Sequence, residues 1–204
     1  MFSAAFSANV RAFNLRIAKR LAHLPISPNQ VTVAGLAVAA VAAVLIGVGQ
    51  LFAGGLVLLF GGAFDMLDGA LARAKQREHI FGALLDSIID RFSEGAIMLA
   101  LLVHFLYTFP PAVVLVLLAT FGSLMVSYVK ARAEGLGLEV KGGLLQRPER
   151  VLLTVAGLLL SSVSPVFLLV VIGVLAVFTN VTAVQRVWLV WREVARRGQH
   201  PHTL

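Results

Sequence analysis

Four aspartates, spaced as two pairs, are the residues whose types and positions point most directly to chemistry. Asp65 and Asp68 are three residues apart and Asp86 and Asp90 are four apart, so each pair projects from one face of a helix. They interrupt a chain that is 59% hydrophobic. A carboxylate within a membrane helix costs on the order of 2.5–3.5 kcal/mol, so four of them need a compensating charge. Divalent cations such as Mg²⁺ prefer oxygen ligands, and the aspartates therefore predict a metal-dependent site.

Small and basic residues accompany the two acidic pairs. Gly69 follows Asp65 by four residues and Gly82 precedes Asp86 by four, so each glycine shares a helix face with a carboxylate. Small residues at such positions let a second helix or a ligand approach closely. A polar turn follows, beginning at Arg73. We therefore expect two membrane helices joined by a short basic turn, with the four carboxylates converging near that turn.

The distribution of charge predicts the helices that must position this site. Asp, Glu, Lys and Arg are absent from three long stretches, at 21–64, 95–129 and 151–185. Divided at their turn residues, these stretches and their flanks predict six membrane helices at about 30–50, 54–75, 79–107, 111–134, 148–162 and 166–192. In this arrangement the Lys and Arg residues lie at or near the side of the membrane that holds both termini. The positive-inside rule then places both termini and the aspartates at the cytoplasmic face of a prokaryotic cell membrane.

The N-terminal segment has a different pattern. Its apolar residues recur every three or four positions, at Phe2, Phe6, Val10, Phe13, Ile17, Leu21 and Leu24. That spacing predicts an amphipathic helix lying in the membrane interface. The expected fold is thus an all-α integral membrane protein with one domain over residues 1–204. It comprises an interfacial helix within 1–24, a six-helix bundle over 25–192 and a cytoplasmic tail at 193–204.

A second group of residues is basic and lies at the inner ends of the later spans. Lys130, Arg150 and Arg186 come from three different spans, and a cation buried at such a position needs an anion. Guanidinium groups suit phosphate oxygens, so this convergence predicts a phosphorylated substrate. The net charge of +7 is likewise interpreted as favouring anionic headgroups and phosphorylated substrates over nucleic acid. A glycine-rich polar stretch at 133–149 is expected to be a flexible connector.

The acidic run resembles the signature of the CDP-alcohol phosphatidyltransferases, D-x2-D-G-x2-A-R-x8-G-x3-D-x3-D. Every spacing is matched, by Asp65, Asp68, Gly69, Ala72, Arg73, Gly82, Asp86 and Asp90. Three further segments resemble those of the phosphatidylinositol-phosphate synthase subfamily, in which inositol phosphate is the acceptor. They are VSYVKARAE at 126–134, RPER at 147–150 and VQR at 184–186.

The resemblance implies roles for individual residues. The four aspartates would hold two Mg²⁺ ions, with Mn²⁺ as an alternative, and Asp90 would also be the general base. The residues expected to border the CDP-lipid are Asn29, Thr32, Gly69, Arg73 and His79. The residues expected to form the acceptor-phosphate pocket are Ser127, Lys130, Arg132, Arg150 and Arg186.

The expected reaction transfers the phosphatidyl group from CDP-diacylglycerol to inositol 1-phosphate and releases CMP. Three alternatives remain open at this point. In the first, the acceptor is glycerol 3-phosphate, as in a phosphatidylglycerol-phosphate synthase. In the second, the lipid is archaeol-based, as in an archaetidylinositol-phosphate synthase, and in the third the protein is a divalent-cation transporter with the aspartates as its permeation site. The resemblance also implies a homodimer.

Overall fold

The computed structural model describes residues 27–74, 80–139 and 142–197, and all regular structure there is helical. The helices are α2 (Pro28–Gly47), α3 (Leu51–Ala74), α4 (Ile80–Thr108), α5 (Ala112–Gly135), α6 (Arg147–Leu160) and α7 (Pro165–Arg196). They match the six expected segments, so the all-helical prediction is confirmed for this part of the chain. The amphipathic helix expected within 1–24 lies outside the described residues.

Three of these helices are long and apolar enough to cross a membrane by length and composition: α2, α5 and α7. The described part of α3 adds the apolar stretch Leu51–Gly62. The 29-residue α4 carries acidic and basic side chains along its first half, and α6 has only 14 residues. The helix α4, which bears Asp86 and Asp90, therefore departs in composition from a simple membrane span.

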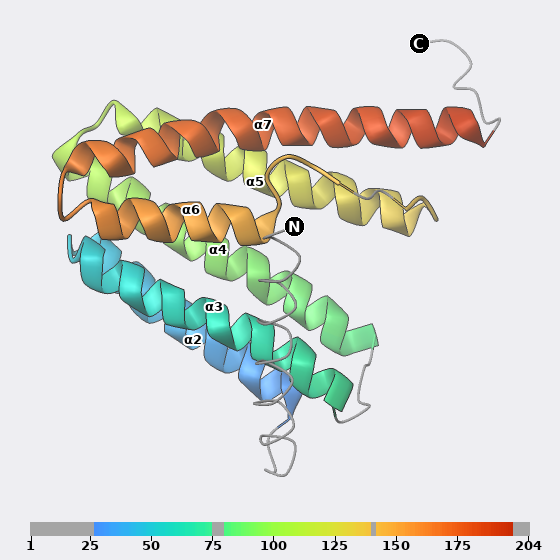
Figure 1. The fold of residues 1–204 in the computed structure, drawn as a ribbon, viewed down its shortest axis with the longest axis horizontal. Coiled ribbons are helices and arrows are strands. Elements are labelled where there is room, and N and C mark those ends of the chain that lie inside the picture. The colour runs from blue at the N-terminus through green and yellow to red at the C-terminus, as the bar shows by residue number, and fades with distance from the viewer. Residues whose placement is uncertain (1–26, 75–79, 140–141, 198–204) are drawn as a thin grey trace, which may run out of the picture.

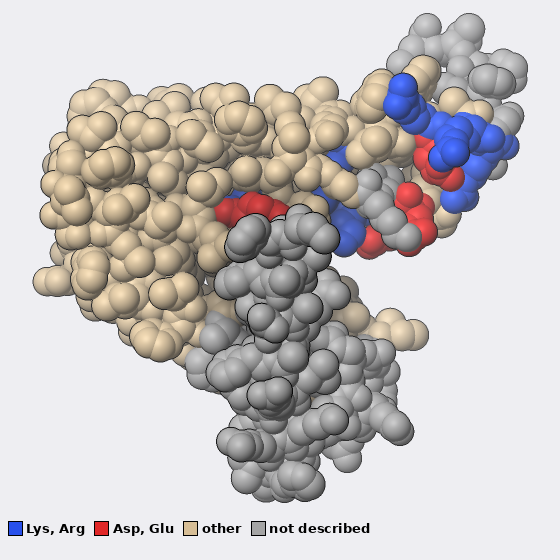
Figure 2. Space-filling view, viewed as in Figure 1, with Lys and Arg blue, Asp and Glu red and all other residues tan. Residues whose placement is uncertain are grey.

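The bundle has one uncharged end and one charged end. The turns at 48–50, 109–111 and 161–164 contain no Asp, Glu, Lys or Arg, and all three lie at the left of Figure 1. From there α2, α3 and α4 run toward the lower right while α5 and α7 run to the right, so the two groups diverge. Charged side chains lie near the middle of the visible face and at its right end, and the left end of that face has none (Figure 2).

Local signals set the bounds of α2. The Ser27 hydroxyl accepts from the Gln30 backbone N–H at 3.3 Å, and the Gln30 side chain accepts from the Ser27 N–H at 2.8 Å. This capping box starts the helix two residues before the predicted position. Gly49, with a φ of 87°, turns the chain into α3, so α2 also ends earlier than expected.

Close approach between helices depends on small residues and on a few polar contacts. A side chain at Gly122 of α5 would collide with Thr179 of α7, and Asn180 donates to the Leu118 carbonyl at 2.9 Å. The apolar core includes Leu101, which is fully buried. These contacts align α5 and α7, whose far ends carry several of the predicted site residues.

The helix α7 continues past the predicted end of its span at residue 192. Its side chains Leu189, Val190 and Val194 pack against Ala133 and Leu138 at the end of α5. The first part of the predicted tail, through Arg196, is therefore helical, because it buries apolar surface against its neighbour.

Candidate active site

Three carboxylates follow one another along a single face of α4. Asp86, Asp90 and Glu94 are each four residues apart, which places them on successive turns of the helix. The side chains of Asp90 and Glu94 are 13% and 12% exposed. Glu94 was not among the predicted site residues, although its spacing from Asp90 and its place in an apolar span indicate that it needs a cationic partner.

The first aspartate pair lies on α3. The backbone of this helix runs through Asp65 and Asp68 to Ala74, and α4 begins at Ile80. The end of α3 and the start of α4 therefore lie at the same end of the bundle (Figure 1). The side chains of Asp65, Asp68 and Arg73 lie outside the described part of the structure, as does His79.

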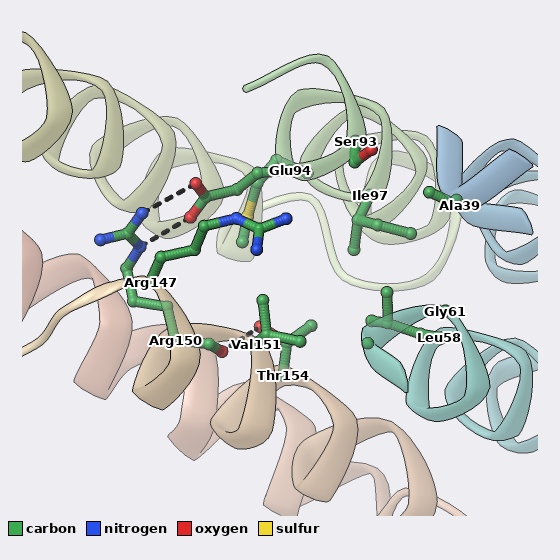
Figure 3. Close-up of a pocket in the computed structure, with 13 residues that line it drawn as sticks. Ala39, Leu58, Gly61, Ser93, Glu94, Ile97, Arg147, Arg150, Val151 and Thr154 are labelled. Atoms are coloured by element: carbon green, nitrogen blue, oxygen red, sulfur yellow. Dashed lines mark hydrogen bonds and ion pairs between the residues drawn. The ribbon is translucent and has the colours of Figure 1, made fainter. Parts of the chain in front are cut away.

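Two arginines at the start of α6 pair with the second and third of these carboxylates, Asp90 and Glu94. Arg147 Nη2 lies 2.7 Å from Asp90 Oδ1. Arg150 donates to both carboxylate oxygens of Glu94, from Nε to Oε1 at 2.7 Å and from Nη2 to Oε2 at 2.8 Å (Figure 3). The i,i+3 spacing on α6 thus matches the i,i+4 spacing on α4, and the two pairs form successive rungs between the helices. We call these four residues the α4–α6 ladder.

The ladder offsets the unfavourable position of two positive charges at the N-terminal end of α6. Arg147 and Arg150 occupy the first turn of α6, where the helix dipole disfavours cations. The α4 carboxylates offset that cost. Within the described bundle, α4 and α6 are not a closely packed pair, and a cavity of about 40 Å³ lies between them and extends to Ala39 and Gly61 (Figure 3). Long side chains, and not backbone contact, therefore connect the two helices.

The residues predicted to border the CDP-lipid lie at the start of α2. Thr32 is 6% exposed and donates to the Pro28 carbonyl at 3.1 Å. Asn29 is exposed, and its Oδ1 lies 3.4 Å from the position that a Cβ would take at Gly82 of α4. The structure therefore places Asn29 close to Gly82, one turn before Asp86. Gly69 lies within α3.

The structure gives each of the three cations whose position predicted a bound anion a partner within the chain. Lys130 pairs with Glu134 at 3.7 Å, and Arg150 pairs with Glu94. Arg186 donates to backbone carbonyls, from Nη1 to that of Val126 at 2.7 Å and from Nε to that of Gly142 at 3.2 Å. Each cation is already satisfied by the protein, so the need for a bound anion does not follow from charge alone.

Arg150 and Arg186 hold the same segment of chain, the loop that leads into α6. Arg150 Nη1 donates to the Leu145 carbonyl at 3.4 Å, and Arg186 binds Gly142. The Leu145 N–H donates to Thr182 Oγ1 at 3.1 Å. Gly143 has a φ of 134°, and a Cβ there would lie 3.2 Å from Arg186 Nε. From residue 142 onward the loop is therefore docked on α7, in contrast to the flexible connector that we expected.

The remaining acceptor residues divide between a groove and the surface. Ser127 and Lys130 of α5 line a groove of about 510 Å³, which Ser87 and Arg91 of α4 border on the other side. Arg132 is exposed in the last turn of α5 and is not part of this lining. Arg91 was not predicted as a site residue, yet its Nη1 lies 3.4 Å from Asp90 Oδ2. The groove therefore opens beside the predicted general base.

The donor set fits a divalent cation as far as it is described. Asp86 and Asp90 supply carboxylate oxygens on adjacent turns, and Asp90 already holds a cationic group in Arg147. Among the described side chains, no group of three or more His, Asp or Glu comes together as ligands. Asp65 and Asp68 would have to complete such a site, and their side chains are outside that part of the chain.

Comparison with known proteins shows the family. The family model described as CDP-alcohol phosphatidyltransferase matches residues 25–195. The chain belongs to this family and is a transferase of phospholipid biosynthesis. This membership replaces the alternative of a cation transporter with an enzyme.

Several relatives and solved structures are similar over most of the chain. The phosphatidylinositol phosphate synthase of Mycobacterium tuberculosis is 39% identical over an alignment of 182 residues that covers 86% of this chain and 84% of that protein. The archaetidylinositol phosphate synthase of Methanothermobacter thermautotrophicus is 37% identical over 190 residues, covering 93% and 94% of the two chains. The structure of the M. tuberculosis enzyme with CDP-DAG bound has a TM-score of 0.81 at 38% identity, covering 87% and 93% of the two chains. Its complex with manganese and citrate has a TM-score of 0.82, covering 87% and 88%.

Proposed function

We propose that this enzyme transfers the phosphatidyl group of CDP-diacylglycerol to the hydroxyl of inositol 1-phosphate. The acceptor oxygen attacks the lipid-side phosphorus, the bond from that phosphorus to the CMP oxygen breaks, and the hydroxyl proton passes to Asp90. The observation that carries the proposal is that Asp90, a member of the α4–α6 ladder, also contacts Arg91, which lines the groove together with Ser127 and Lys130. The similarity to the M. tuberculosis synthase supports the same acceptor.

The aspartates are proposed to hold two Mg²⁺ ions, with Mn²⁺ as a substitute. When bound, the ions would neutralise the diphosphate and stabilise charge on the departing CMP. The carboxylates of Asp65, Asp68, Asp86 and Asp90 would supply the ligands. The complex of the similar M. tuberculosis enzyme with manganese supports a divalent ion in this family.

The start of α2 and the facing turns of α3 and α4 are proposed to bind the nucleotide. Asn29 and Thr32 lie at the N-terminal end of α2, which attracts anionic groups. Asn29 Oδ1 lies 3.4 Å from the position that a Cβ would take at Gly82, so this end of α2 is close to the aspartate-bearing part of α4. Gly69, Arg73 and His79 would complete the CDP-lipid site, as the family signature implies.

The groove is proposed to receive the acceptor. Its volume of about 510 Å³ accommodates a phosphorylated polyol, and Lys130 and Arg91 offer cationic donors on its two sides. Ser127 adds a hydroxyl. Arg132 is proposed to attract the anion at the surface. Arg150 and Arg186 are proposed to act indirectly, by positioning the loop between α5 and α6 through their bonds to the Leu145 and Gly142 carbonyls.

The chain is proposed to span the membrane six times, with an N-terminal interfacial helix and both termini in the cytoplasm. The uncharged turns at one end of the bundle and the charged residues at the other support this orientation. The chain has no cysteine, so single cysteines can be introduced at positions 109, 163 and 139. A membrane-impermeant thiol reagent added to intact cells should label the first two and spare the third. Labelling of position 139 alone would reverse the topology.

A homodimer is proposed from the family resemblance. Large exposed apolar side chains of α4 and α5 are compatible with either lipid or a second copy, for example Phe92 at 67% and Leu117 at 52% exposure. The mass of the purified protein in detergent, corrected for bound detergent, tests this. A mass of one chain would exclude the dimer.

The reaction is tested by CMP release from CDP-diacylglycerol with a single acceptor present in each assay: inositol 1-phosphate, free inositol, glycerol 3-phosphate or serine. We expect release with inositol 1-phosphate and little with the others. Preference for glycerol 3-phosphate would assign the chain to the phosphatidylglycerol-phosphate branch. Preference for free inositol or serine would contradict the phosphate site.

A second candidate keeps the acceptor and changes the lipid. The archaetidylinositol phosphate synthase matches this chain over a larger share of both proteins than the M. tuberculosis relative does. The same assay with CDP-archaeol in place of CDP-diacylglycerol decides between the two lipids, and the preferred donor is the one with the higher kcat/KM.

A further inference from the structure

A cationic side chain of the protein itself occupies the carboxylate of Asp90. Arg147 Nη2 is 2.7 Å from Asp90 Oδ1, and the two side chains are 24% and 13% exposed. Arg91 also contacts Asp90, but at 3.4 Å, from a side chain that is 35% exposed and donates to the Ser87 carbonyl at 2.8 Å. The shorter and less exposed contact is the stronger one, because solvent screens it less.

Arg147 reaches Asp90 from a helix that is held in place one rung further along α4. Arg150 is 2% exposed and is bound through two donors to Glu94. Arg147 and Arg150 are three residues apart in the same helical turn, so the position of one fixes the position of the other. Glu94 also neutralises a buried guanidinium that would otherwise add its charge next to Asp90.

We propose that Arg147 competes with the divalent cation for Asp90. Glu94 neutralises Arg150 and so keeps a second positive charge from repelling the ion. The inference rests on the proposed function, since it takes Asp90 as a metal ligand. A guanidinium and a metal ion are both attracted to the same carboxylate and repel each other, so the affinity for the ion is lower when Arg147 is present. The ladder thereby sets how tightly the site binds its metal.

The two ends of the ladder have opposite effects on the ion, and this separates the proposal from a purely structural role. Removing the charge of Arg147 takes a cation away from the site and should tighten metal binding. Removing the charge of Glu94 leaves the Arg150 guanidinium uncompensated opposite the α4 turn that follows Asp90 and should weaken metal binding. If the ladder only supported packing, both changes would loosen the site and both would weaken binding.

The experiment measures Mn²⁺ binding directly. The purified full-length protein in detergent is titrated with Mn²⁺, and free ion is quantified from its electron paramagnetic resonance signal. Arg147→Gln should lower the dissociation constant by on the order of tenfold, and Glu94→Gln should raise it by roughly threefold to tenfold. The matched control is Arg196→Gln, which removes the same charge from a side chain that is 82% exposed near the end of α7. The control should leave the constant unchanged.

Thermal unfolding and CMP release of the same preparations complete the test. Unchanged or weaker Mn²⁺ binding by folded Arg147→Gln would overturn the inference. If Arg147→Gln does not fold, Glu94→Gln decides alone, and unchanged or tighter binding would overturn it. A wild-type protein that binds no Mn²⁺ would overturn both the inference and the metal-dependent function. A wild-type protein that binds Mn²⁺ and releases CMP, with variant affinities unchanged, would remove the inference alone.

Discussion

The ion pairs of the α4–α6 ladder and those at the end of α7 differ in burial. In the α4–α6 ladder, Arg150 and Glu94 meet at 2.7 Å with side chains only 2% and 12% exposed. Beyond the bundle, at the end of α7, Arg196 lies 3.7 Å from Glu193, and its side chain is 82% exposed. The first pair connects two helices, whereas the second joins neighbouring turns of one helix.

The difference shows that the basic residues at the charged end do not share one role. Exposed pairs contribute about 0–1 kcal/mol, because water and salt screen them. A buried pair adds little net stability over an apolar alternative, yet loss of one partner leaves an uncompensated charge. The residues at the end of α7 therefore suit contact with anionic headgroups, and the ladder fixes the geometry around Asp90.

The largest effect is expected at Asp90, the carboxylate shared by the ladder and the proposed metal site. Asp90→Asn keeps the size of the side chain and removes its capacity to accept the acceptor proton. The rate of CMP release should fall roughly 10²–10⁴-fold. Near-normal turnover by a folded Asp90→Asn protein would show that the buried pair at this position is structural only.

The next effect concerns the stability of the ladder. Arg150→Met retains an extended apolar side chain and leaves Glu94 buried without its bidentate partner. Loss of one partner of a buried pair should cost about 3–5 kcal/mol, which thermal unfolding in detergent detects as a clear drop in Tm. A Tm equal to that of the wild type would mean that the two regions do not differ in the way described.

A smaller effect is expected at Lys130, which belongs neither to the buried ladder nor to the exposed end of α7. Its side chain is 49% exposed and pairs with Glu134 in the groove. Lys130→Met should raise the KM for the acceptor about tenfold, at the lower end for a charge-assisted contact, and leave the KM for the CDP-lipid unchanged. Equal increases in both constants would argue against an acceptor site in the groove.

The smallest effect is expected at the exposed end of α7. Arg196→Met should change the free energy of unfolding by less than about 0.5 kcal/mol and leave the rate of CMP release unaltered. It serves as the counterpart of Arg150→Met, since both remove one guanidinium. A loss of stability comparable to that of Arg150→Met would erase the distinction between the two regions.

The sequence predicts the helices well because uncharged stretches and turn residues are local features. The bounds of α2 differ from the prediction by two or three residues, since the capping box at Ser27 and the positive φ of Gly49 act within single turns. The extension of α7 was not predicted because it depends on contacts between residues distant in sequence. Apolar side chains of α7 pack there against Ala133 and Leu138, namely Leu189, Val190 and Val194.

The spacing of the aspartates indicates chemistry without a structure, whereas the partners of the basic residues do not follow from spacing. Glu94 and Arg150 are 56 positions apart, and no local pattern connects them. The same holds for Arg186, whose partners are backbone carbonyls of Val126 and Gly142. Lys130 lies in the last part of α5 and Arg150 in the first turn of α6, but the partners of both residues follow only from the fold.

The central claim, transfer to a phosphorylated acceptor, is tested most directly by the phosphorus content of the lipid product. The product formed from CDP-diacylglycerol and inositol 1-phosphate is extracted and examined by phosphorus NMR. We predict one phosphodiester and one phosphomonoester signal of equal intensity, formed in the presence of Mg²⁺ or Mn²⁺ and absent with Asp90→Asn. A lipid product with the phosphodiester alone, or no lipid product at all, would contradict the account.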